Sequence, residues 1–433
     1  MTTPLGSASE GPSSEFSSLS LDMKDVTSAS LDAWFVLREI ARASDNSIVL
    51  RGSTKKHIIP VALKCHATMS NDARQMVAQE PLTYEILVYD HAVTAVSAPD
   101  FFVSSLGTVR RQWYFEDSAV SAEGLGPADT ALLRWMLRFT YPSIDELNEG
   151  ATILVMRDHG PTSVWRYFSR KRRDDILHLS LAAFVVQIIS ALDVMAAHGI
   201  VHGDLRWENI LYPRVEELTY FDLTTRRYEK EWSNFSCVPV RRVVKVFDWD
   251  HAFFSHMPFD AKKKAQYSFQ ASEHTNMNSV YDTLGFLRLL YHHFPGVLLD
   301  AADTKDMEPA FTKYAYQDPR DGAILQQASD GACRWQNIER VEEAVQAAKK
   351  TVYDRAAACL VTERRRRTTE AFELATEGGE MMRVVELMRT PRVHDLDHTS
   401  LETLREAARA SRGYPEGPCY DKALDFLSGI LRS

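Results

Sequence analysis

The sequence is short of the features that mark three common classes of protein. Its five cysteines are odd in number and show no zinc-ligand spacing, so neither a disulfide framework nor a zinc site is indicated. It contains no uncharged apolar run of 18 residues, the length that a membrane-spanning helix needs. Its 50 Lys and Arg are outnumbered by 59 Asp and Glu, which disfavours general binding to nucleic acid. We therefore expect a soluble protein of the cytoplasm or nucleus that binds neither a membrane nor a nucleic acid.

The ends of the chain differ in composition from its middle. Residues 1–29 are rich in Ser, Thr, Gly and Pro, so they cannot bury enough apolar surface to offset the entropy lost on ordering. They are predicted to form a disordered leader, and residues 381–433 a helical extension. Between these ends, short β-like runs give way after Gly160 to longer segments of helical period, which indicates an α+β fold.

The most informative stretch is His198–Tyr212, which reads HGIVHGDLRWENILY. In it His202, Asp204 and Asn209 have the spacing H-x-D-x-x-x-x-N. A carboxylate at the second position can take or orient the proton of an attacking hydroxyl, while the amide oxygen at the last can hold magnesium on phosphate groups. Arg206 would place a permanent cation near the transferred phosphate. The same residue types also form ordinary turns, which is the alternative for this stretch taken alone.

A second candidate metal ligand follows a strand predicted at Arg242–Phe247. Asp248 comes directly after this strand and is followed by Trp249 and Asp250. Magnesium prefers hard oxygen ligands and needs only one or two protein carboxylates beside phosphate groups. A carboxylate at this position is chemically able to share a magnesium ion with Asn209. Asp250 is either a second ligand or a turn residue, and the turn is the favoured interpretation.

A basic residue suited to phosphate groups lies much earlier in the chain. Lys64 ends the sequence VALK at 61–64, inside a run predicted to be a β-strand. A helix predicted to begin at Pro81 carries Glu85, and Glu80 directly precedes that helix.

Other elements are predicted from apolar period and length. Strands are expected around Ser47–Arg51, Ile58–Cys65, Phe101–Val109, Arg111–Phe115 and Ala151–Met156, and helices over Asp129–Phe139 and Asp175–His198. The strand at Ala151–Met156 leads into a connection that contains Asp158. Further on, Glu273 ends the sequence Ala-Ser-Glu, Asp282 stands near the start of an apolar helical segment, and Arg366 lies in a run of four arginines.

Taken in this order, the motifs resemble those of the protein kinase superfamily over about residues 35–380. The wording Asp-Trp-Asp at 248–250 is similar to that of fungal-type protein kinases. The resemblance implies a bilobal α+β fold with a small β-rich lobe, one regulatory helix and a mainly α-helical second lobe. The implied domains are a first lobe at 30–156 with an insertion around 97–150, and a second lobe at 157–380 with an insertion at 213–240.

The resemblance also implies a function and a set of residue roles. The expected reaction is transfer of the ATP γ-phosphate to a hydroxyl of a protein substrate, of the Ser/Thr type, with Mg²⁺. Glu85 would pair with Lys64 and hold it on the phosphates, with Glu80 as the alternative partner. Asp282 would brace the catalytic loop, and Arg366 would pair with Glu273. The implied site residues are Asp204, Arg206 and Asn209 for catalysis, Lys64, Glu85, Met156, Asp158 and Asp248 for the cofactor, and Asn209 and Asp248 for the metal.

Departures from the family pattern keep two other functions open. Residues 43–47, at the place of the glycine-rich lid that covers the phosphates, contain no glycine. This absence favours a pseudokinase that acts as a binding scaffold. Gly203 stands where most protein kinases have Arg, a wording that also occurs in aminoglycoside phosphotransferases and would suit a small-molecule kinase. In the usual motif H-R-D-L-K-P-E-N, Trp207 also replaces the Pro.

Overall fold

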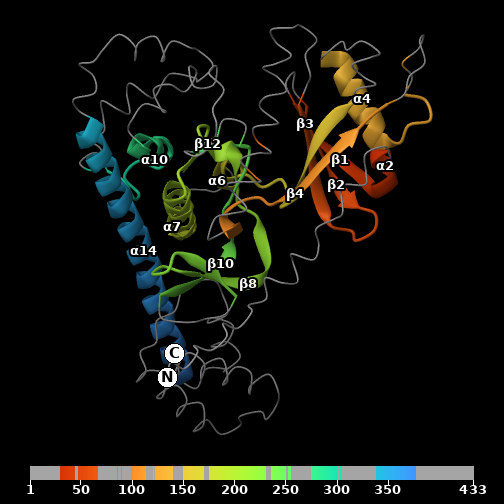
Figure 1. Cartoon of the computed structure of the whole chain (residues 1–433). Helices are drawn as coiled ribbons and strands as arrows, with labels where there is room; N and C mark the ends of the chain where they lie inside the picture. Colours follow the sequence, from red (N-terminus) through yellow and green to blue (C-terminus); the bar gives the residue numbers. More distant parts are fainter. Residues whose placement is uncertain are drawn as a thin grey trace, which may run out of the picture. The chain divides into compact units, whose positions relative to one another are not determined.

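The structure is a computed structural model, and it describes the chain in segments. These are residues 30–43, 47–66, 85, 89, 99–113, 120, 122–139, 150–169, 175–230, 236–249, 252–254, 275–300, 303 and 338–376. The chain divides into two compact units (Figure 1). Unit 1 comprises Met1–Thr94 and Val103–His159, and unit 2 comprises Ala95–Phe102 and Gly160–Ser433. The mixture of helices with antiparallel sheets confirms the predicted α+β class.

Unit 1 is built on a five-stranded antiparallel sheet of strand order β1-β2-β3-β5-β4. Its elements are α2 (Leu31–Trp34), β1 (Phe35–Ala43), β2 (Ser47–Thr54), β3 (Pro60–His66), β4 (Ser105–Arg111), α4 (Pro127–Phe139) and β5 (Ala151–Arg157). The strands predicted at β2, β3 and β5 and the helix predicted at α4 are confirmed. The strand predicted at Phe101–Val109 was placed too early, because Pro99–Phe101 forms a short 3-10 helix, η3.

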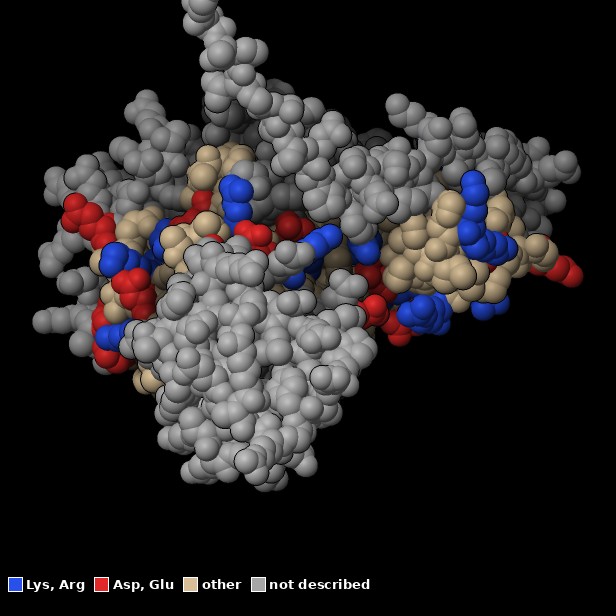
Figure 2. All heavy atoms as spheres, turned by 90° about the horizontal axis from the view of Figure 1, so that it is seen from below, with Lys and Arg blue, Asp and Glu red and all other residues tan. Residues whose placement is uncertain are grey.

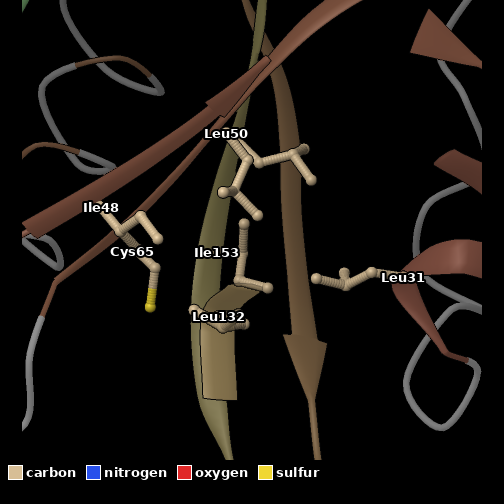
Figure 3. A pocket seen from close by; sticks show the side chains of 7 residues that line it. Leu31, Ile48, Leu50, Cys65, Leu132 and Ile153 are labelled. Atoms are coloured by element: carbon tan, nitrogen blue, oxygen red, sulfur yellow. The ribbon is translucent and has the colours of Figure 1, made fainter. Parts of the chain in front are cut away.

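The core of unit 1 follows from alternation along β2 and β3. Ile48 and Leu50 of β2 and Cys65 of β3 are almost fully buried and face the same side of the sheet (Figure 3). Leu63 of β3, which pairs with Leu50, is also buried. With Leu31, Leu132 and Ile153, these residues line a small apolar gap that has no room for a water molecule. Burial raises the pKa of the Cys65 thiol to about 12, so this cysteine is an inert part of the core.

Two helices of unit 1 cap each other's first turns. The carboxylate of Asp32 in α2 accepts the N–H groups of Ala128 and Asp129 at the start of α4, both at 3.0 Å. In return, Asp129 accepts the N–H of Leu31 at 3.3 Å. Asp129 is fully buried, and its charge is balanced by Arg111 of β4, whose Nε lies 2.8 Å from its Oδ1. This exchange joins the beginning of the unit to α4 and to the edge strand β4.

Unit 2 contains four helices among the described residues, and α7 is the central one. The helices are α6 (Val164–Ser169), α7 (Asp175–Ala197), α10 (Thr275–His293) and α14 (Ile338–Thr376). α7 packs against both α10 and α14 (Figure 1). It is long and apolar enough to cross a membrane, but 67% of its most apolar stretch, within His178–Ala197, is buried. This burial is the pattern of a core helix, as expected for a soluble protein.

The remaining elements of unit 2 are strands, most of them short, and the 3-10 helix η4. They are β6 (Ile200–Val201), η4 (Trp207–Asn209), β7 (Ile210–Leu211), β8 (Arg214–Asp222), β9 (Arg227–Glu229), β10 (Cys237–Arg242), β11 (Lys245–Val246) and β12 (Phe253–Phe254). β7 pairs with β11, and β6 pairs with β12. The predicted insertion at 213–240 forms a three-stranded sheet of order β10-β8-β9.

Two predicted elements of unit 2 have different bounds in the structure. The strand predicted at Arg242–Phe247 is only β11, because Arg242 closes β10 instead. The helix expected to begin near Asp282 is α10, which begins at Thr275, so Asp282 lies inside it. Figure 2 shows basic and acidic side chains interspersed on the described surface of the face that it draws.

Replacing Asp129 by Ala is expected to destabilise unit 1 by about 3–5 kcal/mol, because Arg111 would stay buried without its counter-charge. Asp32→Ala, which removes a helix cap and leaves Arg111 paired, is the matched control and should cost about 1 kcal/mol. Urea denaturation, with hydrogen exchange of the α4 amides, measures both losses. Equal losses in the two variants would contradict the role given to the buried ion pair.

Candidate active site

The loop after α7 brings Asp204 and Asn209 together in unit 2. The Asn209 side chain donates its Nδ2 hydrogens to the main-chain oxygen of Asp204 at 2.9 Å and to its Oδ2 at 3.0 Å. Its own amide oxygen has no hydrogen bond to the described residues. Asn209 is the last residue of the 3-10 helix η4. This short turn brings the side-chain amide of Asn209 back to the carboxylate of Asp204. Asp204 and Asn209 are therefore side by side, and their catalytic and metal-binding roles stay predictions.

Arg206 holds the same carboxylate oxygen. Its Nε lies 3.0 Å and its Nη2 2.5 Å from Oδ2 of Asp204. These hydrogen bonds, followed by the nearby charge of Asp204 itself, raise the pKa of Arg206. The other oxygen of Asp204, Oδ1, accepts no hydrogen bond from the described residues. The carboxylate is thus fixed through one oxygen, and the other can accept a proton from a ligand hydroxyl.

Asp282 fixes the backbone immediately before this carboxylate. From inside α10 it accepts the N–H of His202 at 2.6 Å and the N–H of Gly203 at 3.1 Å. Gly203 has φ +77°, a left-handed conformation that favours glycine, and this accounts for a glycine between His202 and Asp204. Burial raises the pKa of Asp282 although the two N–H groups oppose that shift. The expected brace is therefore confirmed.

His202 connects the loop to Asp248. The His202 ring nitrogen Nε2 lies 2.8 Å from the carbonyl oxygen of Phe247, and the Phe247 N–H donates to the carbonyl of Asn209 at 3.1 Å. Trp249 is fully buried, with its ring centroid 4.8 Å from that of His202. Asp248 lies between Phe247 and Trp249, which are both held in place. Its φ is +71°, a conformation that costs energy for a residue other than glycine.

Asn209 and Asp248 fit the ligand set of a magnesium ion. They supply one neutral oxygen and one carboxylate, and the hydrogen bond from the Phe247 N–H to the Asn209 carbonyl joins the backbone of Asn209 to the residue before Asp248. In the described part of the chain no group of three His, Cys, Asp or Glu side chains comes together. A metal held by phosphate groups and only one or two carboxylates does not need such a group. Asp250 lies outside the described residues.

Unit 1 contains the ion pair expected between Lys64 and Glu85. The Nζ of Lys64 lies 2.8 Å from Oε2 of Glu85, and both side chains are buried. His66 Nε2 lies 3.7 Å from the same oxygen. Because Leu63 and Cys65 face the core, alternation along β3 directs Lys64 to the opposite side of the sheet. Glu80 lies outside the described residues.

Met156 and Asp158, the two residues predicted to border a nucleotide base, have partners within unit 1. Met156 is buried, and its Sδ accepts a hydrogen bond from the hydroxyl of Tyr89 at 3.4 Å. The Asp158 carboxylate binds the guanidinium of Arg51 with N–O distances between 2.7 and 3.0 Å. Its N–H donates to the carbonyl of Pro60 at 3.0 Å. The cofactor-binding roles of both residues stay predictions.

Several residues important to this geometry were not recognised in the sequence. Arg51 is one: it is 8% exposed inside an apolar strand, and a buried Arg requires an acidic partner, which was the available signal. Tyr228 and Gln187, whose side chains accept the N–H of Val244, gave no local signal in the sequence. The pair expected between Arg366 and Glu273 lies outside the described side chains, as do residues 44–46 of the lid.

Comparison with known proteins adds no family to these observations: no protein-family model matches the sequence, and no curated protein matches it. The resemblance to protein kinases therefore rests on the residues and geometry above.

The stability contributed by Asp282 is expected to depend on pH. Because burial raises its folded-state pKa above the unfolded value, its ionisation opposes folding. Its contribution is therefore most favourable below the unfolded pKa of about 3.9 and declines as the pH rises through the folded pKa. The Asn variant at this position does not titrate, so the advantage of wild type over Asp282→Asn should decrease from pH 4 upwards.

Urea denaturation of both proteins at a series of pH values measures this difference. Hydrogen exchange of the His202 and Gly203 amides shows whether the change is local to the brace. Asp282→Ala, which leaves both N–H groups without an acceptor, should cost about 1–3 kcal/mol for each of them. A wild-type advantage that grows with pH would contradict the direction of the pKa shift.

Proposed function

We propose that this protein is an ATP-dependent phosphotransferase, most closely resembling a divergent Ser/Thr-type protein kinase. Under this proposal unit 1 is the small lobe and unit 2 the helical lobe of a kinase-like fold. The observation that carries the proposal is the state of Asp204: Arg206 and Asn209 hold one carboxylate oxygen, and the other accepts no hydrogen bond from the described residues. An arrangement of this kind suits a group that orients a hydroxyl and takes its proton.

The proposed reaction assigns the chemistry of the acceptor to Asp204. Its Oδ1 would accept the hydrogen bond of the attacking hydroxyl, while the hydroxyl oxygen approaches the γ-phosphorus in line with the leaving oxygen. Arg206 restrains the carboxylate and adds a positive charge close to the transferred group. Because little covalent chemistry is asked of the protein, this positioning supplies most of its contribution.

Magnesium and the phosphate groups are assigned to the other residues. Asn209 and Asp248 would hold Mg²⁺, which neutralises phosphate charge when it is bound. Lys64 would contact phosphate oxygens while Glu85 keeps its side chain extended, as their 2.8 Å ion pair allows. Met156 and Asp158 would border the base, and a contact from Asp158 would come from its backbone, because its carboxylate is engaged by Arg51.

The proposal is tested by magnesium-dependent ATP binding and turnover in the full chain. Asp248→Asn should abolish magnesium-dependent nucleotide binding, because the variant loses the only carboxylate assigned to the metal. Asp204→Ala should retain that binding but lose turnover by a factor of about 10²–10⁴, the usual contribution of a general base. Glu216→Gln, a change of charge at an exposed position of β8, is the control and should leave both unchanged.

The outcomes separate the proposal from its two alternatives. Wild-type binding without turnover on any acceptor would favour a pseudokinase that acts as a scaffold. Transfer of phosphate to a sugar or metabolite, and to no protein, would favour a small-molecule kinase. Magnesium-dependent binding that survives in Asp248→Asn would refute the metal assignment.

A further inference from the structure

The strand pair β7–β11, which comes just before Asp248, is too short to be stable on its own. β7 and β11 pair through only two residues each, Ile210–Leu211 and Lys245–Val246. Such a short two-stranded pair is not stable by itself in water. The sheet β10-β8-β9 is inserted between these two strands in the sequence, so its place in the fold bears directly on β11.

A buried side-chain network holds the residue that precedes β11. The N–H of Val244 lies 3.0 Å from Oε1 of Gln187 in α7 and 2.9 Å from the hydroxyl oxygen of Tyr228 in β9. The Tyr228 hydroxyl in turn donates to Oε1 of Gln187 at 2.6 Å. Val244 and Gln187 are both fully buried. Three groups from a helix, the inserted sheet and the start of β11 therefore meet at one point.

Each side chain of this network is itself fixed. The Nε2 of Gln187 donates to the carbonyl of Ala183 at 2.7 Å, which orients its Oε1 toward Val244. The Tyr228 ring packs against Phe101 and Phe221, with centroid distances of 5.0 and 5.5 Å. Burial raises the pKa of Tyr228 well above its ordinary value, so its hydroxyl remains a donor.

The network completes the restraint on the strand before Asp248. At the far end, Phe247 is held by Asn209 and by His202. Val246 is bridged to Phe102, and the Lys245 side chain donates to the carbonyl of Asp100. With the Val244 N–H held as well, every residue from Val244 to Phe247 has a partner outside the strand. Such restraint suits a metal ligand in an unfavourable left-handed conformation, which surrounding structure must impose.

We propose that Tyr228 and Gln187 are positioning residues for Asp248, and that the inserted sheet serves to support the metal ligand. The metal part of this inference rests on the proposed function, whereas the restraint on the strand does not. Groups that orient a metal ligand without touching the metal commonly change its affinity when they are removed.

The test uses Tyr228→Phe, Gln187→Met and the double variant of the full chain. Either single change leaves the Val244 N–H one acceptor, whereas the double change removes both. The matched control is Tyr353→Phe: the Tyr353 hydroxyl of α14 donates to the carbonyl of Leu223, the residue after β8, at 2.7 Å. It is the same chemical change at a hydroxyl that has no hydrogen bond to Val244.

The main readout is the magnesium concentration required for ATP binding. We expect the double variant to need about tenfold more magnesium, the lower end of the effect of lost outer-shell partners. Each single variant should show a smaller increase in the magnesium concentration required. The ATP affinity at saturating magnesium should not change in any variant. Tyr353→Phe should match wild type in its magnesium requirement even where it lowers the melting temperature. A double variant with the requirement of the control would overturn the inference.

A second readout does not depend on nucleotide binding. Hydrogen exchange of residues 243–249 should be faster in the double variant than in wild type and unchanged in Tyr353→Phe. If wild type shows no magnesium-dependent ATP binding, the proposed function fails and this readout alone decides the inference. Faster exchange confined to the double variant would then support the restraint of the strand, and equal exchange in the double variant and the control would overturn it.

Discussion

The buried carboxylate of Asp282 is the interaction on which the candidate loop depends. It stands in α10, about 80 residues after the loop, and accepts two successive N–H groups that would otherwise be buried without partners. Removing a carboxylate from water is costly, and the two N–H donors offset part of that cost. The restraint continues beyond the brace, because the same His202 binds the carbonyl of Phe247 through its ring. One carboxylate thus fixes the backbone beside Asp204 and, through His202, the backbone beside Asp248.

Unit 1 uses buried ion pairs in two different ways. Arg51 with Asp158, and Arg111 with Asp129, join strands to segments 107 and 18 residues further along the chain, and each Arg makes several hydrogen bonds. Their planar guanidinium groups suit such fixed, multiple contacts. Lys64 instead places a compact ammonium group against Glu85 on the sheet side opposite the core. A lysine has three N–H donors and rotates freely, which makes it better suited to share its charge with a ligand.

The sequence predicted those parts of the fold and site whose signal is local. Short β-like or apolar runs located β2, β3 and β5, and the long apolar run located α7. The pair of Lys64 with Glu85 followed from the resemblance to protein kinases, which gives no distance. β1 was missed because its residues after Phe35 are mostly exposed, so no apolar alternation marks it. The mutual caps of α2 and α4 and the contacts of Gln187 with Tyr228 were missed because each partner lies many residues away.

Under the proposed function, the absence of glycine from residues 43–47 gives a physical reason for the support of Asp248. Ala43 of β1 pairs with Ile48 of β2, which leaves only residues 44–47 between the paired positions. Glycines let backbone N–H groups approach phosphate closely, and residues 43–47 contain none. Under the proposed function, more of the phosphate charge must then be neutralised by Lys64 and by magnesium. The position of the metal ligand Asp248 then matters more. A sheet that restrains the strand before Asp248 helps to keep that ligand in place, so that magnesium can supply the charge neutralisation that backbone amides do not.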